Sequence, residues 1–171
     1  AEQLEIDCVY RTDYTDHGYN PEYECSISAV MVILGDNDNS AEIPLGFTFS
    51  WCGTEYTNAF INSNGILYLG TDQTNHDRLM CSDSYEHNDC ISANSDDLHP
   101  ENGGEIKYET RIIGSDRVFI VEWDMVPSAE TGSSNTFQIV LFDSGSTTCD
   151  PAMIQWDVLH YPQDTLIQYR A

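Results

Sequence analysis

The chain has 171 residues and a formal net charge of −23, which results from 29 Asp and Glu against six Lys and Arg. This acidity excludes nucleic acid as a natural partner and disfavours anionic membranes, because both bind proteins through basic side chains. The length is typical of one domain, and a chain in which 40% of residues are hydrophobic is too apolar to stay disordered. No apolar run approaches the ~20 residues that span a bilayer. We therefore expect one folded domain over residues 1–171 that does not insert into membranes.

Short apolar runs separated by clusters of Gly, Asn, Asp and Ser predict strands along the chain. In chain order they cover residues 26–34, 43–51, 58–62, 66–69, 104–110, 117–126, 136–142 and 153–159, with further candidates at 166–169 and 1–7. The Asn64-Gly65 pair supplies the positive φ that a tight hairpin turn requires. No segment of useful length has a helical period. The expected fold is therefore all-β, a single antiparallel β-sandwich with a jelly-roll-like arrangement.

The cysteines predict disulfides and an oxidising compartment. Six cysteines are an even number, and the absence of a CxxC pair argues against a zinc ribbon or a redox motif. They are Cys8, Cys25, Cys52, Cys81, Cys90 and Cys149. We expect three disulfides in a secreted or cell-surface protein, with Cys81–Cys90 and Cys8–Cys25 as the local pairings. A zinc site made of His76, Cys81, His87 and Cys90 is a weaker alternative, because its spacing matches no standard finger.

A polar segment over residues 70–100 is too long for an ordinary connection in a compact domain. Segments of this length usually carry function or are pinned, and Cys81 and Cys90 are expected to pin this one. We therefore expect it to take part in binding.

Two carboxylates invite an enzymatic interpretation. Glu122 and Asp124 lie two apart in a predicted strand and so point to one face. In laminarinase-like glycosidases a Glu-x-Asp-x-x-Glu strand supplies the nucleophile and the acid, whose carboxyls lie about 5–5.5 Å apart. Here the third position is Pro127, and no nucleophile elbow or phosphate-binding loop occurs elsewhere. We expect solvated carboxylates and no enzyme, with a glycoside hydrolase as the least favoured alternative.

Two acidic stretches offer closely spaced oxygen ligands of the kind that calcium prefers. The candidate ligands are Asp36 and Asp38 in the first stretch, and Asp96, Asp97 and Glu101 in the second. The first stretch is not an EF-hand, because Ala41 stands where Gly is needed and Phe47 where Glu is needed. Calcium is the only cofactor expected. Ordinary Asp/Asn turns and hydrogen bonds from loop amides to carboxylates explain the same residues without a metal.

Three blocks of sequence together resemble a known extracellular module. They are IPLGFTFSWCGTEYTNAFINSNGILYLG, SANSDDLHPENGGEIKYET, and RVFIVEWDMVPSAETGSSNTFQIVLFDSGS with IQWDV. The matching positions are Phe47, Phe49, Gly53, Tyr56, Ser63, Asn64, Gly65, Asp96, Asp97, Leu98, Glu122, Trp123, Phe137, Gln138 and Leu141. Over residues 43–158 the pattern resembles nidogen-like domains, which are β-sandwich modules of secreted and cell-surface proteins.

This resemblance implies an extracellular module with no catalysis of its own. It places the Asp96-Asp97-Leu98 stretch in a fixed loop, which makes that stretch the stronger calcium candidate. The cysteine-bearing insertion within residues 70–100 has no counterpart in the module, so we expect individual function there.

Two functions follow from these observations. The favoured one is a structural or adhesive module that assembles with copies of itself into a fibre or surface layer through exposed strand edges. The alternative is a calcium-dependent module that binds an extracellular glycan or protein through residues 70–100.

Overall fold

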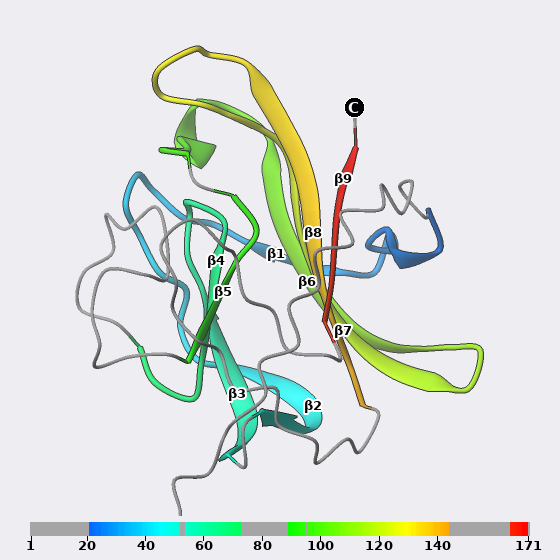
Figure 1. Cartoon of the computed structure of the whole chain (residues 1–171). Helices are drawn as coiled ribbons and strands as arrows, with labels where there is room; N and C mark the ends of the chain where they lie inside the picture. Colours follow the sequence, from blue (N-terminus) through cyan, green and yellow to red (C-terminus); the bar gives the residue numbers. More distant parts are fainter. Residues whose placement is uncertain (1–20, 52–53, 73–88, 95, 144–164, 171) are drawn as a thin grey trace, which may run out of the picture.

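The computed structural model describes residues 21–51, 54–72, 89–94, 96–143 and 165–170. These residues form two antiparallel sheets and very little helix (Figure 1). The strands are β1 (Val30–Val32), β2 (Ile43–Trp51), β3 (Thr54–Ile61), β4 (Ile66–Leu69), β5 (Cys90–Ser92), β6 (Glu105–Ile113), β7 (Asp116–Pro127), β8 (Ser134–Phe142) and β9 (Thr165–Arg170). Two short 3-10 helices are η1 (Pro21–Tyr23) and η3 (Pro100–Asn102).

The strand order is β1-β6-β7-β8-β9 in the first sheet and β2-β3-β4-β5 in the second. Every pairing between neighbouring strands is antiparallel. The all-β antiparallel architecture is therefore confirmed, whereas the jelly-roll arrangement stays a prediction. The candidate strands at 1–7 and 153–159 lie outside the described residues.

Strand positions agree with the expected pattern except near the first strand and at β5, which pairs with β4 inside the segment over residues 70–100, where no strand was expected. The segment 26–34 was expected to be extended throughout, but only Val30–Val32 pairs with β6, because residues 27–28 form a turn. The hairpin of β6 and β7 is longer than expected and pairs as far as Ile113 and Asp116. The turn after β3 is confirmed, with Gly65 at φ 86°.

The main core lies between the two sheets. Alternate residues of β7, namely Phe119, Val121 and Trp123, share one cluster with Leu45, Ile61 and other residues of the second sheet. Trp123 stacks on Phe137 with ring centroids 5.0 Å apart. The other face of β7 is also buried, because Val118 and Ile120 form a second cluster with Val140. Tyr23, the last residue of η1, and Cys25, two residues later, pack against this second cluster.

The structure describes two of the six cysteines. Cys25 carries a free thiol, so the expected Cys8–Cys25 pairing is not formed; its side chain packs on the second cluster instead. Cys90 is disulfide-bonded. The remaining cysteines lie outside the described residues, and the pattern of three disulfides stays a prediction.

Candidate functional site

The turn between β3 and β4 is a buried polar latch made of Asn62, Ser63 and Asn64, each 0% exposed. Burying amide groups is costly unless they are hydrogen-bonded, and these are. The side chain of Asn64 donates to Asn37 Oδ1 at 3.0 Å, and its Oδ1 accepts from the backbone N of Leu98 at 2.9 Å. Asn64 therefore ties the loop before β2 to the loop after β5.

The core holds this latch in place. Trp123 Nε1 donates to the backbone O of Asn62 at 3.1 Å, and Asn62 Oδ1 accepts from the backbone N of Asn64 at 2.8 Å. Gly65 is required for two reasons: its φ is positive, and a Cβ at this position would lie 2.8 Å from Phe137 Cζ. Ser63, Asn64 and Gly65, three of the positions that carry the family resemblance, thus form one structural element.

Asp38 belongs to the latch rather than to an open ligand set. Its backbone N donates to Ser63 Oγ at 3.1 Å, and its O accepts from the backbone N of Ser63 at 2.9 Å. Its carboxylate accepts from the backbone N of Gly35 at 3.3 Å and of Asn39 at 2.9 Å. The Asp38 carboxylate therefore accepts hydrogen bonds from nearby loop amides, which agrees with the metal-free interpretation of this stretch as an ordinary Asp/Asn turn.

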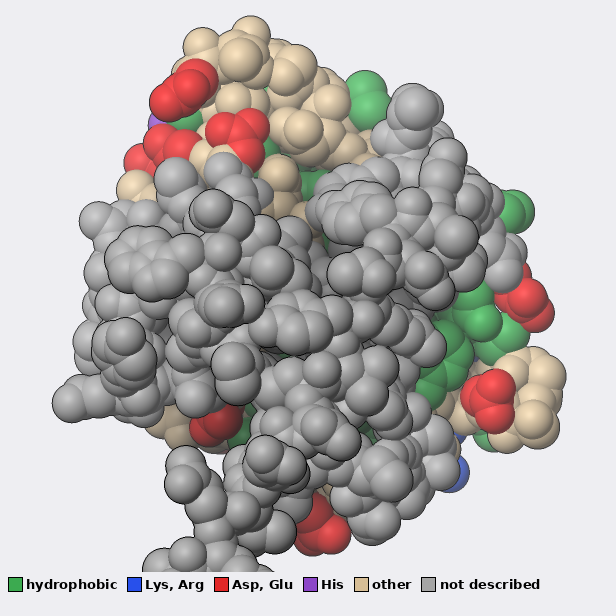
Figure 2. Space-filling view, viewed as in Figure 1, with side chains coloured by type: hydrophobic (Ala, Val, Ile, Leu, Met, Phe, Trp, Pro, Cys, Tyr) green, Lys and Arg blue, Asp and Glu red, His purple; other side chains and the backbone are tan. Residues whose placement is uncertain are grey.

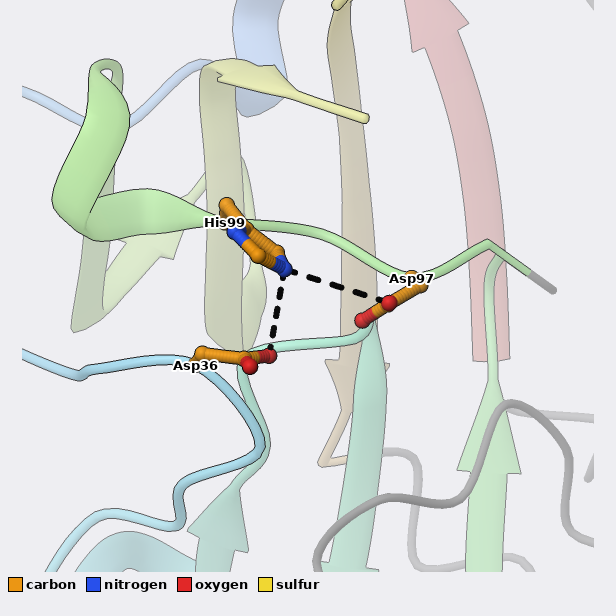
Figure 3. Close-up of side chains that lie close together, drawn as sticks. All are labelled: Asp36, Asp97 and His99. Carbon is orange, nitrogen blue, oxygen red and sulfur yellow. Dashed lines mark ion pairs between the residues drawn. The ribbon is translucent and has the colours of Figure 1, made fainter. Parts of the chain in front are cut away.

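The two loops that Asn64 joins bring Asp36, Asp97 and His99 together (Figure 3). His99 Nε2 lies 3.4 Å from Asp36 Oδ1 and 3.9 Å from Asp97 Oδ2. One potential ligand atom from each of the three residues lies within 4.8 Å of the others. On the other side of the ring, Glu101 Oε1 lies 3.3 Å from His99 Nδ1. We call Asp36, Asp97, His99 and Glu101 the acidic junction.

The structure therefore brings together one predicted ligand from each acidic stretch. Asp38 and Asp96 are not part of the three-residue group. The sequence interpretation did not single out His99, although it lies two residues after Asp97. The Asp-x-His spacing of Asp97 and His99 was the available signal, but it indicates a shared site only once the structure places Asp36 beside both residues.

The acidic junction lies at the surface and is rich in negative charge. The side chains of Asp36, Asp97 and His99 are 40%, 39% and 25% exposed. Acidic side chains gather in this part of the surface, near η3 and the β7–β8 turn (Figure 2). Within the described part of the chain, the Oδ1 atom of Asp97 is buried and has no hydrogen-bond partner. An unpaired buried carboxylate oxygen is costly.

A second group of carboxylates surrounds Lys107. Its Nζ lies 3.2 Å from Glu122 Oε1, 3.6 Å from Asp124 Oδ2 and 3.6 Å from Glu105 Oε2. Glu122 is only 4% exposed, and its Oε2 also accepts from Gln138 Nε2 and from the backbone N of Cys25. The expectation of solvated carboxylates was therefore wrong for Glu122, because the segment after η1 covers this face of the sheet. Glu122 and Asp124, the pair that invited a glycosidase interpretation, share one lysine.

The charges in this group shift two pKa values. Partial burial alone would lower the pKa of Lys107, but the hydrogen bond and charge of Glu122, with the charges of Asp124 and Glu105, outweigh it and raise that pKa. Burial raises the pKa of the Cys25 thiol far above its usual range, and the charges of Glu122 and Glu109 add to the effect. This thiol therefore stays protonated at neutral pH and is a poor nucleophile.

Two expectations cannot be placed in the structure. Of the alternative zinc ligands only Cys90 is described, and residues 73–88 of the polar segment lie outside the described residues.

No helix within the described ranges is long and apolar enough to span a membrane.

Comparison with known proteins identifies the family. A family model described as NIDO related matches residues 9–148, which is most of the chain. No curated protein and no solved structure matches the chain significantly. NIDO-related domains are typically extracellular. The chain belongs to the NIDO-related family.

Proposed function

We propose that this chain is a non-catalytic adhesive module of the extracellular space, and that it binds its partner through a divalent cation held at the acidic junction. The observation that carries the proposal is the convergence of Asp36, Asp97 and His99, which the buried Asn64 side chain organises from two separate loops.

Preorganisation supports a binding role. The three buried polar residues of the latch hold two exposed acidic loops next to each other. Bringing Asp36 and Asp97 together costs electrostatic free energy, since like charges repel at short range. A bound cation reverses the sign of this interaction, and rigid ligands lose little entropy when they bind it.

The ligand set favours a zinc-like ion over calcium. Calcium takes six to eight oxygen ligands, whereas imidazole nitrogen suits zinc and related transition metals. Two carboxylates and one imidazole leave at least one coordination position for an outside ligand. A carboxylate or hydroxyl oxygen of an extracellular glycan or protein fits that position, which gives a cation-bridged contact.

Thermal unfolding and calorimetry with zinc, calcium or magnesium test the proposal. A cation that binds the folded state at 100 times its Kd stabilises it by about 2.7 kcal/mol. We expect zinc to give the largest stabilisation, with Asp36→Asn and His99→Gln abolishing it. Asp116→Asn removes an exposed carboxylate from the β6–β7 turn and is the matched control.

Each outcome is informative. If calcium stabilises the protein and only Asp36→Asn removes the effect, the site holds calcium through oxygen ligands alone. If no cation stabilises the protein, or if Asp36→Asn and Asp116→Asn respond equally, the cation-dependent function is wrong.

A structural role through strand edges is the second candidate function. The observation that favours it is the exposed, uncharged edge of β1. Electron microscopy of the purified chain tests it in its broad form, because a fibre subunit forms long regular particles whereas a binding module stays dispersed.

A further inference from the structure

The strand β1 lies at an edge of the first sheet as far as the described residues form it. It pairs with β6 on one side, and no described strand pairs with it on the other. An edge strand presents free backbone donors and acceptors, so natural proteins protect such edges with charged residues, proline or bulges. Residues 26–35 contain no charged residue, although 20% of the chain is Asp, Glu, Lys or Arg. Among the described residues β1 has neither a proline nor a register shift, so its short length is what limits the edge.

β2, one of the two edge strands of the other sheet, shows the contrast. β2 contains Pro44, and a register shift follows it around Gly46, whose φ is 83°. Side chains of the first sheet also cover its backbone: Thr110 Oγ1 donates to the O of Leu45 at 2.8 Å, and Arg117 donates to the O of Gly46 at 3.3 Å. β2 therefore carries several of the devices that β1 lacks.

Large apolar side chains are exposed along β1 and beside it. Ile27 is 108% exposed, Ile33 is 91% exposed, and Val30 and Met31 are about half exposed, at 50% and 49%. Four such side chains within seven residues are unusual on the surface of a chain with a net charge of −23. A partner that covers them must present a surface that is equally apolar and free of charge.

We propose that the partner is a second copy of this chain, and that the two β1 edges pair antiparallel across a two-fold axis. The segment 26–35 supplies both halves of the contact, because a two-fold interface places the same patch of each copy against the other. The five-stranded sheets of the two copies then form one continuous sheet. Because a two-fold contact uses the β1 edge of both copies, it gives a closed dimer rather than a growing fibre. The inference rests on the second candidate function only in that both use a strand edge; it narrows that contact to a closed pair and is independent of the cation site.

The charge of the chain predicts how the dimer responds to salt. Two copies that each carry −23 repel one another, so screening by salt strengthens their association. A basic partner on the same edge would bind more weakly as salt rises. The direction of the salt effect therefore distinguishes a second copy from a basic partner.

Sedimentation of the full chain over a range of concentrations tests the proposal. We expect the mass to rise with protein concentration from that of a monomer to twice that value. Sodium chloride should shift this rise to lower protein concentration, and EDTA should leave it unchanged. Ile33→Lys places a charge at the edge without removing a buried contact, and it is expected to abolish the dimer. Ile112→Lys is the control, because Ile112 is also an exposed isoleucine, 67% exposed, but lies on β6 away from the edge. Circular dichroism of both variants establishes that they fold.

A chain that stays monomeric at every concentration and salt, a dimer that survives Ile33→Lys, or filaments in place of dimers each overturn the proposal. Loss of the dimer in EDTA would also overturn it and would assign the contact to the acidic junction. A dimer that resists EDTA in a chain that binds no cation would support the β1 contact and refute the cation site.

Discussion

Two groups of the same make-up have opposite characters in this protein. Each consists of three carboxylates around one basic side chain: Glu105, Glu122 and Asp124 around Lys107, and Asp36, Asp97 and Glu101 around His99. In the first group the base is a lysine. The Glu122 carboxylate of this group is almost fully buried and accepts hydrogen bonds from two further donors. In the second group the base is a histidine, which carries charge only when protonated, and the three carboxylates stay close to solvent.

The difference indicates which group is structural. The Lys107 group contains its own permanent cation, so its charges are paired as the chain folds. The acidic junction lacks one, so its negative charge is available to an ion from solution. Clusters of carboxylates are therefore better compared by the charge that accompanies them than by the number of acidic residues.

The largest expected effect is that of Lys107→Met. Removing the lysine leaves Glu122 charged, buried and without its cation, and breaking a buried ion pair in this way costs about 3–5 kcal/mol. Urea denaturation measures the change. The corresponding change at the acidic junction, His99→Gln, is expected to alter the free energy of unfolding by less than about 1 kcal/mol, since pairs near the surface contribute little. Equal losses in the two variants would contradict the distinction between the groups.

Asn64→Ala is expected to have the next largest effect. It removes both hydrogen bonds that join the two loops and leaves the buried backbone N of Leu98 without its acceptor, at a cost of about 2–3 kcal/mol. It should also remove any stabilisation by cations, because Asp36 and Asp97 are no longer held together. Asn135→Ala is the control: within the described residues, the Asn135 side chain donates to backbone O atoms near its own turn, those of Val126 and Ser133. A response to cations that survives Asn64→Ala would show that the latch does not organise the acidic junction.

The smallest expected effect is a dependence on alkaline pH. The pKa of Lys107 is raised in the folded state, so its contribution to stability is fully present below the ordinary lysine value of 10.5 and is lost as pH rises above it. The difference in stability between the wild type and Lys107→Met should therefore be constant near neutral pH and shrink above 10.5. Denaturation curves recorded for both proteins across this range check the direction. A difference that shrinks on acidification below neutral pH instead would require another group to be responsible.

Part of the candidate site could be predicted from the sequence. Asp36 and Asp97 were both named as ligands because closely spaced carboxylates are visible in any single stretch. Their meeting was not predictable, since it depends on Asn64, which contacts loops 27 and 34 residues away in the chain. The role of His99 was missed for the same reason. Glu122 was misjudged because the residues that bury it, around Cys25, lie 97 positions away.

What the sequence by itself determined is the local structure: the alternating strands, the Gly65 turn and the all-β class, together with the family. These features follow from properties encoded within a few residues, namely the two-residue period of a strand and the backbone freedom of glycine. Only the tertiary structure decided which strand became an unprotected edge, which carboxylates became buried and which loops met. These outcomes depend on strand order and on long-range hydrogen bonds, and a local pattern of residues does not contain them.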